Sequence, residues 1–137
     1  MDRRQTLALA LLLVALLLAG CGNRASGLLG TTWRLIEIDG QAPLAGTEAT
    51  LHFEGQEVSG NTGCNQYFGE YTAGRSELGF GVLGQTEMAC LEPEGLMAQE
   101  RAYLDALSRA EQFTVADDQL RVLCKGGDVL VFALVDH

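Results

Sequence analysis

The stretch that decides the fold is SGNTGCNQYFGEY, Ser59 to Tyr71, in which a cluster of turn-forming residues directly precedes a run rich in aromatic residues. Glycine adopts backbone conformations that are closed to most other residues, and asparagine tolerates the left-handed region. We therefore expect a tight turn from Gly60 to Asn65 that leads directly into a strand from Gln66 to Tyr71. Cys64 lies at the junction of the two.

Outward from this stretch, short segments alternate apolar and polar residues, which is the period of strands with one buried face. Leu51 and Phe53 are the clearest case, because the residue between them, His52, is polar. The predicted strands are residues 32–38, 50–54, 57–59, 66–71, 77–83, 112–115, 119–124 and 129–135. In 77–83, glycines alternate with Phe80 and Val82, so one face of this strand is expected to be bare.

One helix is predicted, from Pro93 to Arg109. Proline is favoured in the first turn of a helix, and Glu92 and Glu94 would interact favourably with the positive end of the helix dipole. Apolar residues then recur at helical spacing. Together the elements predict an α+β, mainly β fold, in which a curled antiparallel sheet or small barrel of about seven to eight strands carries one packed helix.

The first 20 residues are predicted to be a signal peptide. The apolar run from Leu7 to Leu18 is shorter than the roughly 20 residues that cross a bilayer. It ends in Leu18-Ala19-Gly20-Cys21, which resembles the signal of bacterial lipoproteins, where the cysteine is lipidated. This resemblance implies lipid on Cys21, and Gly22 in place of aspartate points to the outer membrane, facing the periplasm. A plain secretory signal or an uncleaved anchor is the alternative.

We therefore assign residues 1–20 to the signal peptide, 21–27 to a polar tether and 28–137 to one domain of about 110 residues, which is enough for a single core. The chain has 9 Lys and Arg against 18 Asp and Glu, a net charge of −9. This excess argues against nucleic acid as a partner and against electrostatic docking on anionic lipid. We expect a monomer that is held at the membrane through Cys21.

Three further cysteines, Cys64, Cys90 and Cys124, would then lie in an oxidising compartment, where disulfides persist. Three cysteines allow one bridge and leave one thiol. Cys124 falls on the apolar phase of its strand, so we expect its side chain to be buried and to behave as a small hydrophobe.

Four groups of residues give the chain the pattern of a known family. They are Trp33 with Leu35; Ser59-Gly60 with Gly63-Cys64-Asn65 and Gly69-Glu70-Tyr71; Thr86-Glu87-Met88-Ala89-Cys90; and Glu100 with Tyr103-Leu104-Asp105-Ala106-Leu107. On these residues, the chain from Leu28 to its C-terminus resembles the META domain, the HslJ-like family. The resemblance implies a barrel-like sheet with a packed helix. It also implies a small envelope protein, often lipid-anchored and linked to stress or antibiotic tolerance, whose biochemical activity is not established.

The family spacing, together with export, favours a disulfide between Cys64 and Cys90 over two buried thiols. The motif residues that the resemblance marks are Gly63, Cys64, Asn65, Met88, Ala89 and Cys90. The family pattern does not require Cys124.

Other candidate chemistry has simpler explanations. Cys64, Asn65 and His52 are the residue types of a thiol protease, but a cysteine in a disulfide cannot attack a substrate. The sequence has no Cys-x-x-Cys, and His52 and His137 lack the spacing of zinc ligands. We expect neither enzyme activity nor a metal or cofactor.

Two functions are left open. The favoured one is a non-enzymatic, lipid-anchored envelope protein that binds another envelope component. The alternative is a small-ligand carrier that uses the mouth of the curled sheet, which an apolar cavity of roughly several hundred Å³ would support. Tyr67, Phe68 and Tyr71 are candidates to stack such a ligand, although core packing is the commoner role of aromatic residues on a strand.

Overall fold

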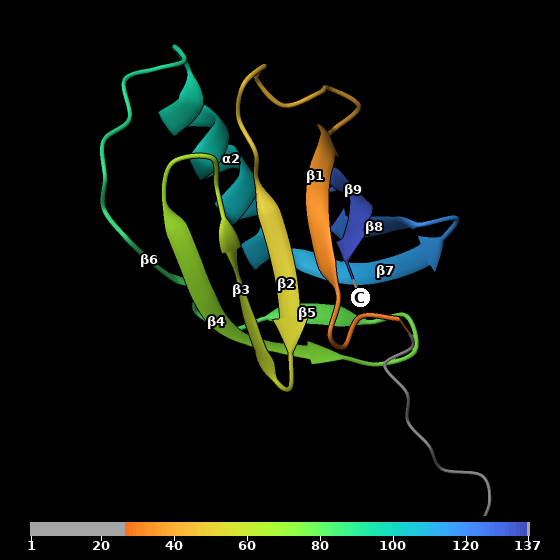
Figure 1. The fold of residues 1–137 in the computed structure, drawn as a ribbon. Helices are drawn as coiled ribbons and strands as arrows, with labels where there is room; N and C mark the ends of the chain where they lie inside the picture. Colours follow the sequence, from red (N-terminus) through yellow and green to blue (C-terminus); the bar gives the residue numbers. More distant parts are fainter. Residues whose placement is uncertain (1–26, 137) are drawn as a thin grey trace, which may run out of the picture.

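A computed structural model describes residues 27–136 (Figure 1). The strands are β1 (Thr32–Ile38), β2 (Thr50–Glu54), β3 (Glu57–Asn61), β4 (Gln66–Ala73), β5 (Leu78–Phe80), β6 (Gly84–Gln85), β7 (Ala110–Ala116), β8 (Gln119–Cys124) and β9 (Val129–Asp136). The helix α2 (Leu96–Ser108) lies between β6 and β7. The predicted signal peptide, the lipidation site Cys21 and most of the predicted tether lie outside the described residues.

The strands form one antiparallel sheet in the order β5-β4-β3-β2-β1-β9-β8-β7, with β6 on the edge of β4. The two ends of this order meet, because the N–H of Phe113 on β7 donates to the carbonyl of Ser76, just before β5, at 2.8 Å. The sheet is therefore a nearly closed barrel, with α2 packed across it in Figure 1. The predicted fold, a mainly β antiparallel barrel with one packed helix, is confirmed.

The interior of the barrel is filled by the apolar phase of each strand. Its largest fully buried side chains include Trp33, Leu51, Phe53, Tyr67, Leu120, Leu130 and Phe132. Tyr103 and Leu107 of α2 join this core. So does Leu28, the second of the described residues, which has an exposed fraction of 0%. The N–H of Gly30 and the carbonyl of Thr31 then both bond to Phe53 of β2, so the chain is tied to the barrel before β1 begins.

The helix begins later than predicted. Gly95 has a φ of 89° and caps the helix, so the first helical residue is Leu96 rather than Pro93. A residue in the left-handed region cannot lie inside a right-handed helix, so the preceding residues are excluded. The first turn of α2 contains no acidic residue, so Glu92 and Glu94 lie just before the helix rather than in its first turn.

The predicted strand 77–83 is also interrupted. It ends at Phe80, and the chain then passes against β4 before pairing again at Gly84. Gly69 on β4 makes room for this passage, since a Cβ there would lie 2.9 Å from the side chain of Leu83. Leu83 consequently packs against the core, whereas Val82, which the predicted alternation placed on the same face as Phe80, is 97% exposed.

Candidate functional site

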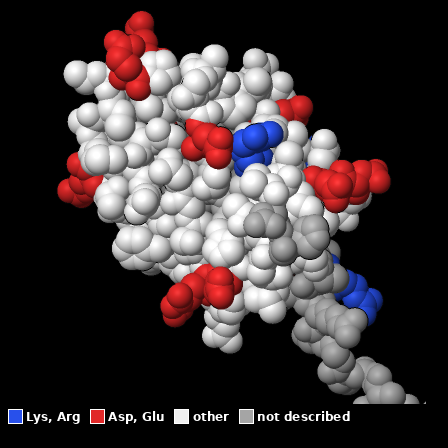
Figure 2. All heavy atoms as spheres, in the orientation of Figure 1, with Lys and Arg blue, Asp and Glu red and all other residues white. Residues whose placement is uncertain are grey.

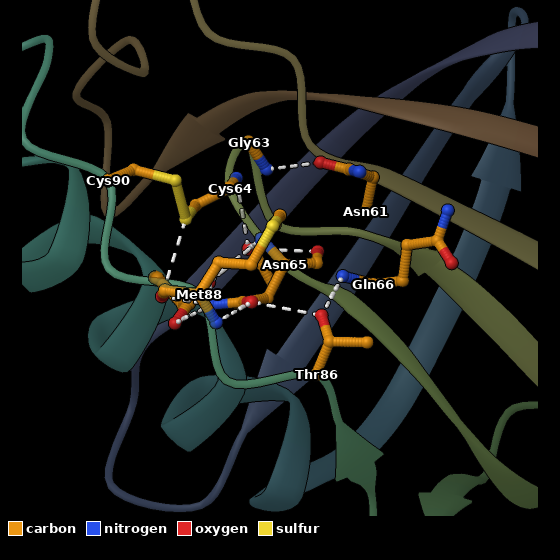
Figure 3. Close-up of a disulfide and its surroundings, with 10 residues drawn as sticks. Asn61, Gly63, Cys64, Asn65, Gln66, Thr86, Met88 and Cys90 are labelled. Atoms are coloured by element: carbon orange, nitrogen blue, oxygen red, sulfur yellow. Dashed lines mark hydrogen bonds between the residues drawn. A yellow bond between two sulfur atoms is a disulfide. The ribbon is translucent and has the colours of Figure 1, made fainter.

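The turn between β3 and β4 lies within the glycine- and asparagine-rich stretch Ser59 to Tyr71, and a disulfide fixes it (Figure 3). β3 continues to Asn61, so the turn is shorter than predicted and comprises residues 62–65. The N–H of Thr62 donates to the carbonyl of Asn65 at 2.8 Å, and Gly63 takes a φ of 99° that favours glycine. Cys64 is bonded to Cys90, with their Cα atoms 6.0 Å apart.

The Asn65 side chain holds the segment that leads to Cys90. Its amide Nδ2 donates to the carbonyl of Met88 at 3.1 Å. Its Oδ1 accepts from the N–H of Met88 at 2.7 Å and from the hydroxyl of Thr86 at 2.9 Å. Asn65 thus pairs with Met88 as a strand would, although its own backbone is in the turn (Figure 3). The Met88 side chain and Ala89 are exposed, so the backbone of this part of the motif is what the turn recognises.

Glu100 of α2 ties the same turn to the helix, and its exposed fraction is 3%. Its carboxylate accepts hydrogen bonds from the hydroxyl of Thr62 and from the backbone N–H of Asn65, the latter at 3.2 Å. Both carboxylate oxygens also accept from Nδ2 of Asn65, at 3.0 Å. A buried carboxylate is tolerated only where such donors replace water. Three elements therefore meet at one buried polar cluster: the turn, the segment 86–90 and the helix.

Sequence reasoning recognised Glu100 only as part of the family pattern. One signal does mark it, because a charged residue on the apolar stripe of a helix needs a buried partner. The partner Asn65 lies 35 residues earlier, so local periodicity does not reveal it.

One turn further along α2, Tyr103 meets Tyr67 of β4. Their hydroxyls are 2.8 Å apart, and that of Tyr67 also donates to the carbonyl of Thr50 at 2.6 Å. Burial raises the pKa of both phenols well above the ordinary value near 10. Both tyrosines are therefore neutral hydrogen-bonding groups of the core and do not stack a ligand in the mouth of the barrel.

The thiol-protease arrangement does not form. Cys64 is in the disulfide, and the ring of His52 lies on the outside of β2, where Nδ1 contacts the hydroxyl of Thr32 at 2.9 Å and Nε2 contacts Glu54 at 3.1 Å. Cys124 is the free cysteine among residues 27–136, and burial raises the pKa of its thiol to about 11. Such a thiol is protonated at neutral pH and is a poor nucleophile.

Within residues 27–136, no group of three or more His, Cys, Asp and Glu side chains is placed to hold a metal ion. No helix in this part of the chain is long and apolar enough to cross a bilayer. Tyr103 and Leu107 of α2, both with an exposed fraction of 0%, fill part of the core inside the curled sheet. This packing argues against the ligand carrier, because the alternative required an apolar cavity at that place.

The fold and the turn together define a class of protein: a small antiparallel barrel, closed by one helix, with a disulfide-locked hairpin. The sequence matches the META domain over residues 26–137, so the chain belongs to the META domain family. That family is not known for enzymatic activity.

Solved structures agree with this assignment. An NMR structure of a protein from Burkholderia xenovorans is 34% identical, with a TM-score of 0.69 over 82% of this chain and 87% of that chain. A crystal structure of a DUF4847 family protein from Bacteroides vulgatus is 12% identical, with a TM-score of 0.62 over 82% of this chain and 97% of that chain, and shows the fold alone. A search of curated proteins finds no match.

Proposed function

We propose that this protein is a non-enzymatic, lipid-anchored protein of the cell envelope that binds another envelope component, in stress or antibiotic tolerance. The observation that carries the proposal is the Cys64–Cys90 disulfide. A disulfide in a small domain is typical of an oxidising compartment outside the cytoplasm. The same bond takes the motif cysteine out of nucleophilic chemistry, which leaves the cluster around Asn65 with an architectural role.

The sequence before the domain supports the lipid anchor. The apolar run to Leu18 and the small residues before Cys21 fit a signal that is cleaved at that cysteine. One acyl chain binds a membrane only marginally, and two or more bind it stably. A lipidated Cys21 would therefore hold the domain firmly, and Gly22 favours the outer membrane, facing the periplasm, as its location.

A Cys21→Ala variant tests the anchor. Expressed in a Gram-negative bacterium, the unchanged protein should sediment with outer-membrane fractions. The variant should be absent from them and should be found either in the periplasm or as the precursor that keeps its signal peptide. Cys124→Ala is the matched control, because it also removes one thiol but should leave fractionation unchanged. Recovery of the Cys21→Ala variant in outer membranes at the unchanged level would contradict the lipid anchor.

The binding role is tested by chemical crosslinking in intact cells, followed by mass spectrometry of the captured species. A defined envelope protein that is captured by the unchanged chain and lost with the Cys64→Ser/Cys90→Ser pair would support the proposal. If the purified protein instead retains a small molecule and captures no partner, the function is that of a carrier and the proposal is wrong.

A further inference from the structure

One outer face of the barrel carries an unusual arrangement of charge, and we call it the β2–β4 face: His52 and Glu54 of β2, Glu57 and Ser59 of β3, and Phe68 and Glu70 of β4. Strand alternation places these side chains outside, because their neighbours Phe53, Val58 and Tyr67 are buried in the core. All three glutamates are exposed.

The three glutamates stand side by side across the strands. Glu54 pairs in register with Glu57, and Glu57 with Glu70. Like charges directly opposite each other destabilise a sheet. Among the described ion pairs, only the contact between His52 and Glu54 touches this row, so Glu57 and Glu70 have no basic partner within residues 27–136. One of the several acidic groups in Figure 2 lies low on the barrel, near where the β2–β3 hairpin ends in Figure 1.

The face is hollowed on both sides of Glu70. One hollow of about 450 Å³ is lined by residues that include Ser59, Phe68 and Glu70. A second, of about 590 Å³, runs from Glu70 past Gly79 and Gly81 of the β5 region. Glu70 lines both hollows, and we call the two together the groove.

The fold does not require the bare floor of the second hollow. Neither Gly79 nor Gly81 has a positive φ. A Cβ at Gly79 would approach only the Thr72 hydroxyl, at 3.4 Å. A Cβ at Gly81 would lie 3.6 Å from the Glu70 carbonyl oxygen and 4.0 Å from the Glu70 Cβ, which are ordinary contact distances. By contrast, a Cβ at Gly60 would overlap the carbonyl oxygen of Thr50 and lie 2.6 Å from the Tyr67 hydroxyl. Close packing therefore requires glycine at position 60. At positions 79 and 81 packing does not require glycine, and the absence of side chains there leaves the groove open.

An aromatic ring borders the other end of the groove. Phe68 lies opposite Ser59 in the register, one row from the glutamates, and is 59% exposed. An exposed aromatic face attracts Lys and Arg side chains, and nearby carboxylates pair with the same groups.

We propose that the β2–β4 face and its groove are the docking surface for an extended, basic segment of a partner protein. Charge complementarity indicates that the partner segment is basic. Glu54, Glu57 and Glu70 pair with the Lys or Arg side chains of that segment, and Phe68 packs against one of these side chains. The floor at Gly79 and Gly81 lets a polypeptide backbone approach closely. This inference rests on the proposed function, in that it gives the chemistry of the envelope component that is bound.

The test is a calorimetric titration of the purified full-length protein with hexalysine, with hexaglutamate as the matched anionic peptide. Hexalysine should bind saturably and hexaglutamate should not. The Glu57→Gln/Glu70→Gln variant should lose at least about tenfold in affinity, since each charge-assisted contact is worth on the order of a factor of ten. The control Glu87→Gln/Glu92→Gln removes the same charge from exposed positions elsewhere and should bind as the unchanged protein does.

A second variant, Gly79→Val/Gly81→Val, keeps every carboxylate and fills the floor. It should weaken hexalysine binding while leaving the thermal midpoint of unfolding near that of the unchanged protein. Equal losses in the two glutamate variants, or full binding by the filled variant, would overturn the proposal, because attraction would then come from net charge alone. A partner captured in cells that has no basic segment would overturn it too, yet would leave the envelope-binding function standing.

Discussion

Asn65 shows how one side chain substitutes for a strand. The backbone of the turn cannot pair with the segment before Cys90, so the Asn65 amide pairs with the N–H and the carbonyl of Met88 instead. An aspartate at this position would lack the Nδ2 donor, and a glutamine would place the amide one methylene too far. The turn therefore depends on the identity of this residue more than on its polarity.

Replacing Glu100 is expected to destabilise the fold strongly. Glu100→Ala removes the carboxylate that accepts from the Thr62 hydroxyl and from two N–H groups of Asn65, and it leaves these donors with only their weaker bonds within the turn and to Met88, at a cost of about 3 kcal/mol. Glu100→Gln keeps one oxygen and should cost less. Urea denaturation measures the free energy of unfolding, and exposed Glu94→Ala is the control, expected within about 0.5 kcal/mol of the unchanged protein. A Glu100→Ala value as small as the control's would refute the role of the cluster.

Cys124 is expected to be chemically silent in the folded protein. Burial raises the pKa of its thiol to about 11, so almost none of it is thiolate at pH 8. With Cys21→Ala protein and no reductant, Ellman's reagent should detect no reactive thiol in the native state and the Cys124 thiol after addition of urea. Rapid labelling of the native protein would contradict both its burial and its raised pKa.

At the scale of the elements, Gly60 of β3 and Gly79 of β5 should respond in opposite ways to the same substitution. Gly60→Ala forces a methyl group onto the Thr50 carbonyl and should lower the free energy of unfolding by about 3 kcal/mol or more. Gly79→Ala meets only the Thr72 hydroxyl and should be neutral or stabilising by up to about 1 kcal/mol, since alanine loses less backbone entropy. Thermal unfolding of the two variants distinguishes these outcomes, and equal losses would count against the close approach at Gly60.

Strict alternation made the strand around Leu51 and Phe53 predictable, because each inward residue is separated from the next by one exposed or half-exposed neighbour. The segment after Phe80 was not predictable in the same way. Leu83 turns inward in place of Val82 because Gly69, on a strand that is distant in sequence, leaves space there. Likewise, Pro93 is a normal signal for a helix start, but the backbone of Gly95 determines where α2 begins.

The candidate site was predictable in its parts and not in its assembly. The turn residues and the cysteines stand out in the sequence, whereas the link from Glu100 to Asn65 spans helix and hairpin. Such contacts depend on how the two elements pack against each other. The periodicity of the helix or of the hairpin strands, taken alone, does not predict them. The acidic row on β2, β3 and β4 has the same character, because it exists only in the register of three strands.

At the scale of the whole molecule, the disulfide joins the barrel to the segment that precedes α2. The two cysteines are 26 residues apart, and closing a loop of that length is worth about 3–4 kcal/mol in the chain-entropy estimate. Cys64→Ser/Cys90→Ser should lower the free energy of unfolding by about that amount in urea. The single Cys124→Ala variant serves for comparison, and a double variant that is as stable as the unchanged protein would show that the bond contributes nothing to stability.

The stability of the fold should fall at alkaline pH. The pKa values of Tyr67 and Tyr103 are raised in the folded state, so their contribution to stability is fully present below the unfolded value near 10. Above that pH the unfolded chain loses its phenolic protons while the folded chain keeps them, and the free energy of unfolding decreases. Comparing unfolding at pH 8 and pH 11 should show a smaller decrease for Tyr103→Phe than for the unchanged protein. An identical decrease would mean that other groups cause it.

Leu28 belongs to the core, and under the proposed lipid anchor this limits how far the barrel would extend from the membrane. With Cys21 as the lipidated residue, only residues 22–27 separate the anchor from the first core side chain. A fully extended chain covers at most about 3.6 Å per residue, so the core begins within about 25 Å of the bilayer surface. Under the proposed lipid anchor, the domain would therefore sample only a thin layer next to the membrane, and a partner would have to come into that layer.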